Sequence, residues 1–205
     1  MARKSGSSGE KTRAMVEDAA IRLIARYGFA AVSMRQIARE VGVQAGALYL
    51  YTPDKQSLLF DIMRGHLVHL LDSWQQHSPP VETPAVIRLE RFVRFHIDYH
   101  IMRAEKVFIS YMELRNLEPE NFSEIERLRR DYEHVIEEIL TAGVAEGAFE
   151  HTDSRLTTMA MIAMLTGVST WYRDGGRLPA GAIATRYVDM AFRLAGAEPL
   201  AEVAE

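Results

Sequence analysis

The sequence contains no cysteine. Without thiols the chain can form no disulfide framework, no thiolate metal site and no cysteine nucleophile. It also lacks any segment long and apolar enough to span a bilayer, and the opening MARKSGSSG has no hydrophobic stretch typical of a signal peptide. With 205 residues, 48% of them hydrophobic, the chain can still bury one sizeable core or two small ones. We therefore expect a compact cytoplasmic protein with no membrane partner.

The motifs of common enzymes are missing as well. The sequence has no phosphate-binding glycine loop, no dinucleotide fingerprint and no nucleophile elbow. Two histidine pairs, His66/His69 and His96/His100, have the spacing of neighbours on one helical face. Neither pair has the glutamate of a zinc-binding HExxH motif, and a pair alone is only half a metal site. We expect these histidines to be structural or pocket-lining, and we expect no metal, no cofactor and no enzymatic activity.

Charge is unevenly distributed along the chain. The net charge is −4, yet residues 1 to 60 carry nine Lys/Arg against five Asp/Glu, whereas residues 61 to 205 carry 15 against 23. A basic segment followed by an acidic one favours an N-terminal part that touches nucleic-acid phosphates, with the acidic part held away from them.

Apolar residues recur at helical spacing along almost the whole chain, and no strand-like alternation, internal repeat or low-complexity segment occurs. The sequence predicts an all-α protein with about nine helices. Local start and stop signals, such as Asp153 before one helix and Gly147 after another, define their ends. The expected helices cover residues 11–27, 34–41, 44–49, 54–77, 83–100, 105–114, 122–146, 153–172 and 179–194.

The most informative segment runs from Ser33 to Tyr51 (SMRQIAREVGVQAGALYLY). Ser33 and Gln36 form a capping box that begins one short helix, and Gly42 ends it at a sharp turn. A second short helix follows and packs on the first, so the pair reads as a helix-turn-helix. The second helix turns a small, polar face outward, made of Gln44, Ala45, Gly46 and Tyr49, which can approach base edges closely.

With its flanks, this segment resembles the DNA-binding domain of the tetracycline-repressor (TetR) family. The resemblance rests on the preceding helix, the Tyr27-Gly28-Phe29 break, Ser33-Met34-Arg35, Ile37-Ala38, Gly42-Val43, Gly46, Leu48-Tyr49 and Asp54-Lys55. It departs from the usual pattern at Gln44, where a capping serine is common, and at Thr52, where an aromatic residue is common. The resemblance implies four parts: a basic N-terminal arm (1–10), a helix-turn-helix domain (11–55), an effector-binding and dimerisation domain (56–196) and a C-terminal tail (197–205).

The family resemblance also implies roles for individual residues. Contacts with a double-stranded, palindromic operator are expected from Ser33, Arg35, Gln44, Ala45, Gly46, Tyr49, Tyr51 and Lys55. An effector cavity is expected at Phe92, His96, Tyr99, Arg103, Phe108, Tyr111, Met112, Met164 and Trp171, although aromatic and methionine side chains at helical spacing are also typical of plain core. The uncharged run from Thr157 to Val168 and the last helix suggest a homodimer interface at Met161, Met164, Val168, Tyr187 and Met190.

The C-terminal stretch from Gly167 to Tyr187 is similar to the tail of TetR-type regulators of fatty-acid and steroid breakdown, a branch with members that sense acyl-CoA thioesters. Arg173, Arg177, Lys106 and Arg103 are available to meet an anionic group. The sequence thus predicts a homodimeric repressor released by a small hydrophobic, anionic effector. Three alternatives stay open: a sensor of cationic or other hydrophobic drugs, a DNA-binding protein without an effector, and a small-molecule-binding protein that has lost DNA binding.

Overall fold

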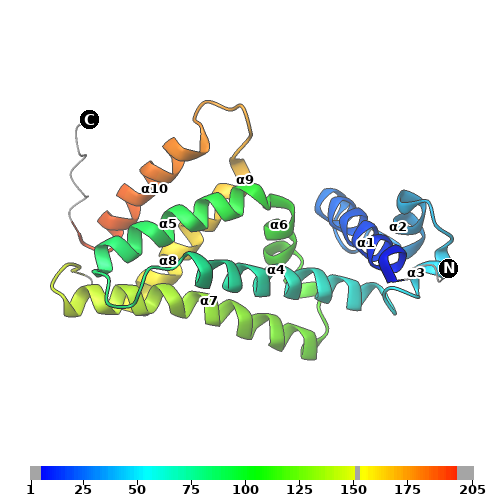
Figure 1. Cartoon of the computed structure of the whole chain (residues 1–205), viewed down its shortest axis with the longest axis horizontal. Coiled ribbons are helices and arrows are strands. Elements are labelled where there is room, and N and C mark those ends of the chain that lie inside the picture. The colour runs from blue at the N-terminus through cyan, green and yellow to red at the C-terminus, as the bar shows by residue number, and fades with distance from the viewer. Residues whose placement is uncertain (1–5, 151–152, 198–205) are drawn as a thin grey trace. The chain divides into compact units, whose positions relative to one another are not determined.

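The computed structural model describes residues 6–150 and 153–197. Within those ranges every regular element is a helix, as expected for an all-α protein. No helix in the described ranges combines the length and the hydropathy needed to cross a membrane. The helices, labelled in Figure 1, are α1 (Gly6–Tyr27), α2 (Met34–Val41), α3 (Ala45–Leu48), α4 (Lys55–His77), α5 (Ala85–Met102), α6 (Ala104–Met112), the 3-10 turn η1 (Leu114–Asn116), α7 (Pro119–Ala145), α8 (Ser154–Thr166), α9 (Val168–Trp171) and α10 (Ala180–Leu194).

These elements form two compact units. The first contains the residues up to Leu67 together with Glu105–Glu126, and the second contains Val68–Ala104 together with the residues from Arg127 onward. The chain passes from one unit to the other three times: within α4, at the start of α6 and within α7.

Local sequence signals account for the helix-turn-helix of the first unit. The Ser33 Oγ accepts a hydrogen bond from the Gln36 backbone N–H at 3.3 Å, and the Gln36 Oε1 accepts one from the Ser33 N–H at 2.7 Å, which completes the capping box. Gly42 adopts φ 79°, the left-handed conformation that ends α2 at little steric cost. Ile37 and Leu48 are fully buried and bring α2 and α3 together.

The second unit is built around α5. This helix packs along α10 and also contacts α8 and α9, and Figure 1 shows α5 and α10 side by side. Phe92 of α5 and Phe192 of α10 are fully buried in the core. The Trp74 ring of α4 meets the Phe92 ring edge-on at 5.1 Å, a favoured arrangement of two aromatic rings.

Most helix ends lie within a few residues of the sequence prediction. Asp153 caps α8, since its Oδ1 accepts from the Leu156 N–H at 2.9 Å, and Gly147 follows α7 with φ 71°. Two starts differ: α1 begins at Gly6 instead of residue 11, and α7 begins at Pro119 instead of residue 122. The helix predicted over 153–172 is divided into α8 and α9 at Gly167, although the Gly167 backbone keeps helical angles (φ −53°, ψ −25°).

Candidate nucleic-acid interface and ligand pocket

The outer face of α3 is accessible, as its sequence suggests. Gln44, Gly46 and Tyr49 are exposed, and Ala45 is half-buried. Gln44 is the N-cap of α3 in an extended conformation, and its side chain makes no capping hydrogen bond. Its amide group is therefore free of the helix and available to a base edge. A β-carbon added at Gly46 would meet nothing within 4 Å, so glycine is not required there by packing within the chain.

At the start of α2, Ser33 and Arg35 are both exposed. The Ser33 hydroxyl already takes part in the capping box. Arg35 has no ion pair in the described part of the chain, so its guanidinium can meet a phosphate without breaking an internal contact. Tyr51 is half-buried in a hollow of about 230 Å³, lined also by Arg13, Glu17 and Asp61. Burial raises the pKa of the Asp61 carboxyl, while Arg13 lowers it and Glu17 raises it further.

Lys55 makes contacts inside the first unit that the sequence did not indicate. Its Nζ donates hydrogen bonds to the backbone carbonyls of Phe29 and Val32, each at 2.9 Å, and lies 4.1 Å from the centre of the Phe29 ring. An ammonium has three N–H donors, so at most one is left for a DNA phosphate. Lys55 therefore stabilises the turn between α1 and α2, in addition to any contact that its third N–H makes with a DNA phosphate.

Glu113 holds the same turn from another side and was missed by sequence reasoning. Its carboxylate, only 8% exposed, accepts from the Phe29 backbone N–H at 3.2 Å and from Asn116 Nδ2 at 2.6 Å. A further link comes from Gln56, whose Nε2 donates to the Asn116 carbonyl at 2.6 Å. Lys106 of α6 also pairs with Glu17 of α1 at 3.1 Å. The Glu105–Glu126 segment is thus bound directly to the helix-turn-helix part of its unit.

The predicted effector residues of α5 are mostly core. Phe92 and His96 are fully buried, and the His96 ring is stacked on that of His100 with centroids 3.7 Å apart and planes 5° from parallel. His96 Nδ1 lies 3.2 Å from the Tyr132 Oη, and its Nε2 lies 3.3 Å from the Thr166 Oγ1. Because both His96 nitrogens are in hydrogen bonds, His96 cannot bind a metal ion without losing one of them.

Burial controls the ionisation of these two histidines. It lowers the pKa of His96 well below its usual range, and His100 lowers it further. Burial also lowers the pKa of His100 to about 4, against a hydrogen bond to the His96 carbonyl that raises it, while Arg103 lowers it. Both rings are therefore neutral at pH 7 and serve as hydrogen-bonding core groups.

The remaining predicted effector residues divide between the units. Tyr99, Arg103, Met164 and Trp171 belong to the second unit, whereas Phe108, Tyr111 and Met112 belong to the first. Tyr99 is buried beneath Arg103, whose guanidinium carbon lies 4.1 Å from the ring centre. Met164 is half-buried, while Phe108 and Met112 are exposed.

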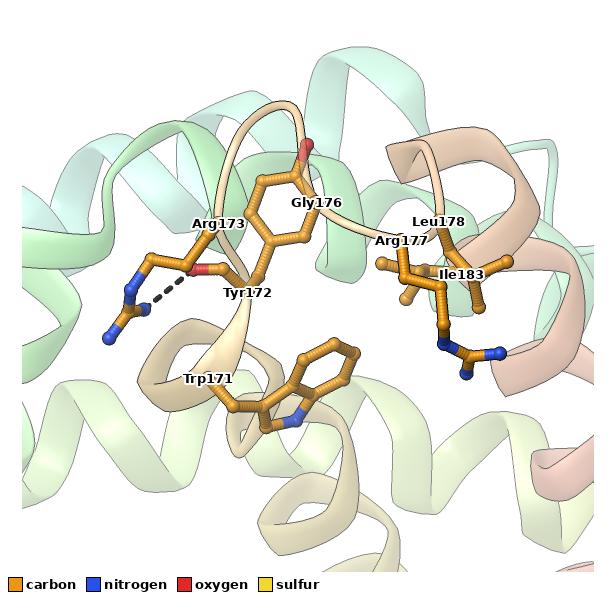
Figure 2. A pocket seen from close by; sticks show the side chains of 7 residues that line it. All are labelled: Trp171, Tyr172, Arg173, Gly176, Arg177, Leu178 and Ile183. Carbon is orange, nitrogen blue, oxygen red and sulfur yellow. Dashed lines mark hydrogen bonds between the residues drawn. The ribbon is translucent and has the colours of Figure 1, made fainter.

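Trp171 lines a pocket of about 370 Å³ in the second unit, between the end of α9 and the start of α10. The indole is half-exposed and lies nearly parallel to the Tyr187 ring, with centroids 6.5 Å apart. Figure 2 shows Arg177 extending to the same side of the loop as the indole, whereas Arg173 extends away, with its Nη1 donating to the Tyr172 carbonyl at 2.6 Å. The lining residues are Trp171, Tyr172, Arg173, Gly176, Arg177, Leu178 and Ile183.

The predicted dimer residues have unequal access to solvent. Met161 and Val168 are fully buried in the core of the second unit, so they have no surface left for a second copy. Met164 and Tyr187 are half-buried, and Met190 is 47% exposed. The apolar face that α8 does expose has the i, i+3, i+4, i+7 spacing of one helical side and consists of Leu156, Met159, Ala160 and Ala163. Sequence periodicity could not find this face, because the helix is apolar nearly all round.

Two family models match the chain in succession. Residues 17–62 match the model of bacterial regulatory proteins of the tetR family, and residues 82–195 match the model of the tetracyclin repressor-like C-terminal domain. The second match alone covers more than half of the chain.

Individual relatives agree with the family models. The HTH-type transcriptional repressor KstR2 of Rhodococcus jostii (strain RHA1) is 27% identical over 189 residues, 91% of each chain. The fatty acid metabolism regulator protein of Bacillus subtilis (strain 168) is 24% identical over 156 residues, 75% of this chain and 80% of that relative. The crystal structure of AibR in complex with isovaleryl coenzyme A and operator DNA superimposes with a TM-score of 0.77 at 26% identity, over 88% of this chain and 97% of AibR. The resemblance drawn from the sequence, including its fatty-acid and steroid branch, is confirmed.

Proposed function

The chain belongs to the tetracycline-repressor family of transcriptional regulators and is not an enzyme, and on that premise we propose how it acts. It is a cytoplasmic homodimer that binds a palindromic operator through its two helix-turn-helix units. A small anionic effector of the acyl-CoA type binds the C-terminal domain and releases the DNA. Ligand binding can release DNA only if the effector has higher affinity for the free form than for the DNA-bound form.

The observation that supports the operator contacts is the accessible face of α3. Gln44 has an uncommitted amide at the amino end of α3, and glutamine can form two hydrogen bonds with an adenine edge in the major groove. The small residues Ala45 and Gly46 let that end approach the bases. Arg35 and Tyr49, both exposed, serve as phosphate contacts that fix the register of the helix on DNA.

The pocket beside Trp171 supports an effector with both an aromatic or apolar part and an anionic part. Its aromatic wall comes from Trp171 and Tyr172, and its positive charge on the side of the indole comes from Arg177. Arginine forms strong bidentate hydrogen bonds with phosphate and carboxylate groups, and indole rings stack on flat heterocycles such as adenine. A coenzyme A thioester carries both kinds of group, and a relative of the same fold is solved with isovaleryl coenzyme A.

Exposed apolar side chains support the dimer. Leu156 and Met159 are 63% and 53% exposed on α8, and Met190 and Leu194 are exposed one turn apart on α10. The two helices are in contact, and large apolar side chains exposed on both are typical of an interface, because a monomer gains nothing by exposing them. Two linked heads are needed to read two half-sites of a palindrome.

The test is a DNA-release titration. An operator is first selected from randomised duplexes by binding to the protein, and its release is then followed by fluorescence anisotropy with acyl-CoAs, free fatty acids, steroids and cationic dyes. We expect acyl-CoAs to release DNA, and we expect Trp171→Ala and Arg177→Gln to require at least about tenfold more of them. Arg88→Gln, a change on α5 outside the pocket, is the matched control.

Each of the other outcomes would indicate a different function for this protein. Release by cationic dyes alone would replace the thioester with a drug-like effector. Release by no compound would leave a DNA-binding regulator without a small-molecule effector, and failure to select any operator would indicate that DNA binding has been lost.

A further inference from the structure

A second pocket of the C-terminal domain has no residue in common with the one beside Trp171. It has a volume of about 380 Å³ and lies along one side of α5, next to the last turns of α4. Pockets for small molecules generally have volumes of several hundred cubic ångströms. The residues that line it are Ser73, His77, Arg91, Arg94, Phe95, Asp98, Tyr99, Met102 and Arg103. We name this pocket the α4–α5 groove.

Positive charge dominates the α4–α5 groove. Three arginines line it against a single carboxylate, Asp98. Arg94 is already engaged, since its Nε donates to Glu90 at 2.8 Å and its Nη1 donates to Thr185 at 3.2 Å. Arg91 and Arg103 form no ion pair in the described part of the chain, so their positive charge is not neutralised there. Burial raises the pKa of the Asp98 carboxyl, while Arg94 lowers it.

The floor of the groove is aromatic. The Phe95 ring lies between those of His77 and Tyr99, with centroid separations of 5.6 Å on either side. Trp74 supports Phe95 from the core at 5.3 Å. The Tyr99 hydroxyl is hydrogen-bonded to His69 Nδ1 at 2.9 Å, and burial raises the pKa of Tyr99 to about 12, so this phenol adds no negative charge. Arg103, stacked on the Tyr99 ring, continues the flat surface toward solvent.

We propose that the α4–α5 groove is a binding site for a planar aromatic carboxylate, separate from the effector pocket beside Trp171. The flat ring of the ligand lies against Phe95 and His77, where aromatic rings stack in offset or tilted arrangements. Its carboxylate is held by Arg103, which already lies over the Tyr99 ring and whose fork-shaped guanidinium matches the two oxygens of a carboxylate. Arg91 lies about three turns earlier on α5 and contributes only longer-range positive charge. Met102, 71% exposed at the rim, covers the outer edge of the ring.

The proposal does not depend on DNA release or on the thioester, because its test measures binding alone. Isothermal titration of the full-length protein is carried out with naphthoate, with the neutral naphthylmethanol and with naphthylmethylammonium. We expect naphthoate to bind at least about tenfold more tightly than either isostere, since only naphthoate forms charge-assisted hydrogen bonds with Arg103. Equal affinity for naphthylmethanol, or no binding of naphthoate at millimolar concentration, would overturn the proposal.

Substitutions locate the site. Arg103→Gln should weaken naphthoate binding about three- to tenfold, and Arg91→Gln should weaken it by no more than about twofold. Asp98→Asn should strengthen binding about twofold, because it removes the only opposing charge in the lining. Arg177→Gln, in the other pocket, is the matched control and should leave naphthoate affinity unchanged. All four side chains lie at the surface, and circular dichroism verifies that each variant is folded. Loss of binding in Arg177→Gln, with no change in the groove variants, would assign naphthoate to the Trp171 pocket and refute the groove as its site.

Discussion

The carboxylate of Glu113 accepts a hydrogen bond from the backbone N–H of Phe29, 84 residues earlier in the chain, at 3.2 Å. Lys55 binds the carbonyl of the same residue at 2.9 Å. The Phe29 peptide groups are therefore held by two charged side chains, one that follows α6 and one that begins α4. This turn connects α1 to α2, so its position fixes where the helix-turn-helix begins.

Replacing Glu113 should cost stability because the buried Phe29 N–H would lose its acceptor. For Glu113→Ala we expect the free energy of unfolding to fall by about 1–3 kcal/mol, the usual cost of leaving a buried donor unsatisfied. Glu113→Gln keeps an oxygen that can accept from the Phe29 N–H, but it places an amide NH2 opposite the donating NH2 of Asn116. We therefore expect a smaller loss of unfolding free energy than for Glu113→Ala. Urea unfolding followed by circular dichroism measures both, with Glu118→Ala, an exposed change nearby, as control. A Glu113→Ala protein as stable as its parent would contradict the role given to this bond.

Gln44 is expected to determine operator preference. Because its amide makes no capping bond, Gln44→Ala should leave the helix-turn-helix folded and relax selectivity at one base pair, an effect of about 1–3 kcal/mol. Arg35→Ala should instead weaken binding to all sequences alike and flatten the dependence of affinity on salt, since phosphate contacts release counterions. Selection from randomised duplexes with each variant separates the two effects. If the Gln44 variant selects the parent operator with unchanged discrimination, Gln44 does not read a base.

Sequence reasoning succeeded where the determining signal was local. The capping box of Ser33 and Gln36, the left-handed turn at Gly42 and the Asp153 cap each depend on residues a few positions apart, and all are present. It failed where a contact joins distant segments. In the sequence Glu113 is an ordinary acidic residue and Lys55 is predicted as a phosphate contact, a role that stays a prediction. The bonds of both side chains to Phe29 are visible only in the fold.

The same limit applies to α8. Its run of apolar residues shows that the helix is covered on most sides, but a helix without a polar face gives no period from which to tell core from interface. The structure separates buried from exposed positions on this helix: Met161 is buried in the chain, whereas Met159 is exposed. Met159 and Leu156 therefore replace Met161 and Val168 in the proposed dimer surface.

The stacked pair His96 and His100 predicts acid sensitivity. Burial lowers both pKa values below the usual 6.5, that of His100 to about 4, so the unfolded chain binds protons that the folded chain does not. Stability should be constant above about pH 6.5 and should fall as the pH decreases toward 4, by up to about 1.4 kcal/mol per pH unit for each histidine. Urea unfolding at pH 8, pH 6.5 and pH 5 measures the slope.

A pair of variants isolates this effect from other titrating groups. His100→Gln keeps a donor for the His96 carbonyl and should reduce the dependence of stability on pH between 6.5 and 5. His134→Gln, a change at an exposed histidine of α7, should keep the dependence of the parent. A His100 variant with the same slope as the parent would show that this ring is not buried as a neutral group.

The exposed apolar face of α8 can be tested by placing one charge on it. Met159 is 53% exposed, so Met159→Glu should not disturb the core of its own chain. In a dimer closed over this face, the new carboxylate would be buried without a partner, at a cost of about 3–5 kcal/mol. We expect light scattering to show a monomer and circular dichroism to show a native helix content. Operator affinity should fall strongly, since a single helix-turn-helix unit reads only one half-site. Val81→Glu, a change at a 71% exposed position in the loop before α5, should remain dimeric and bind the operator normally. A dimer of unchanged affinity in the Met159 variant would move the interface away from α8.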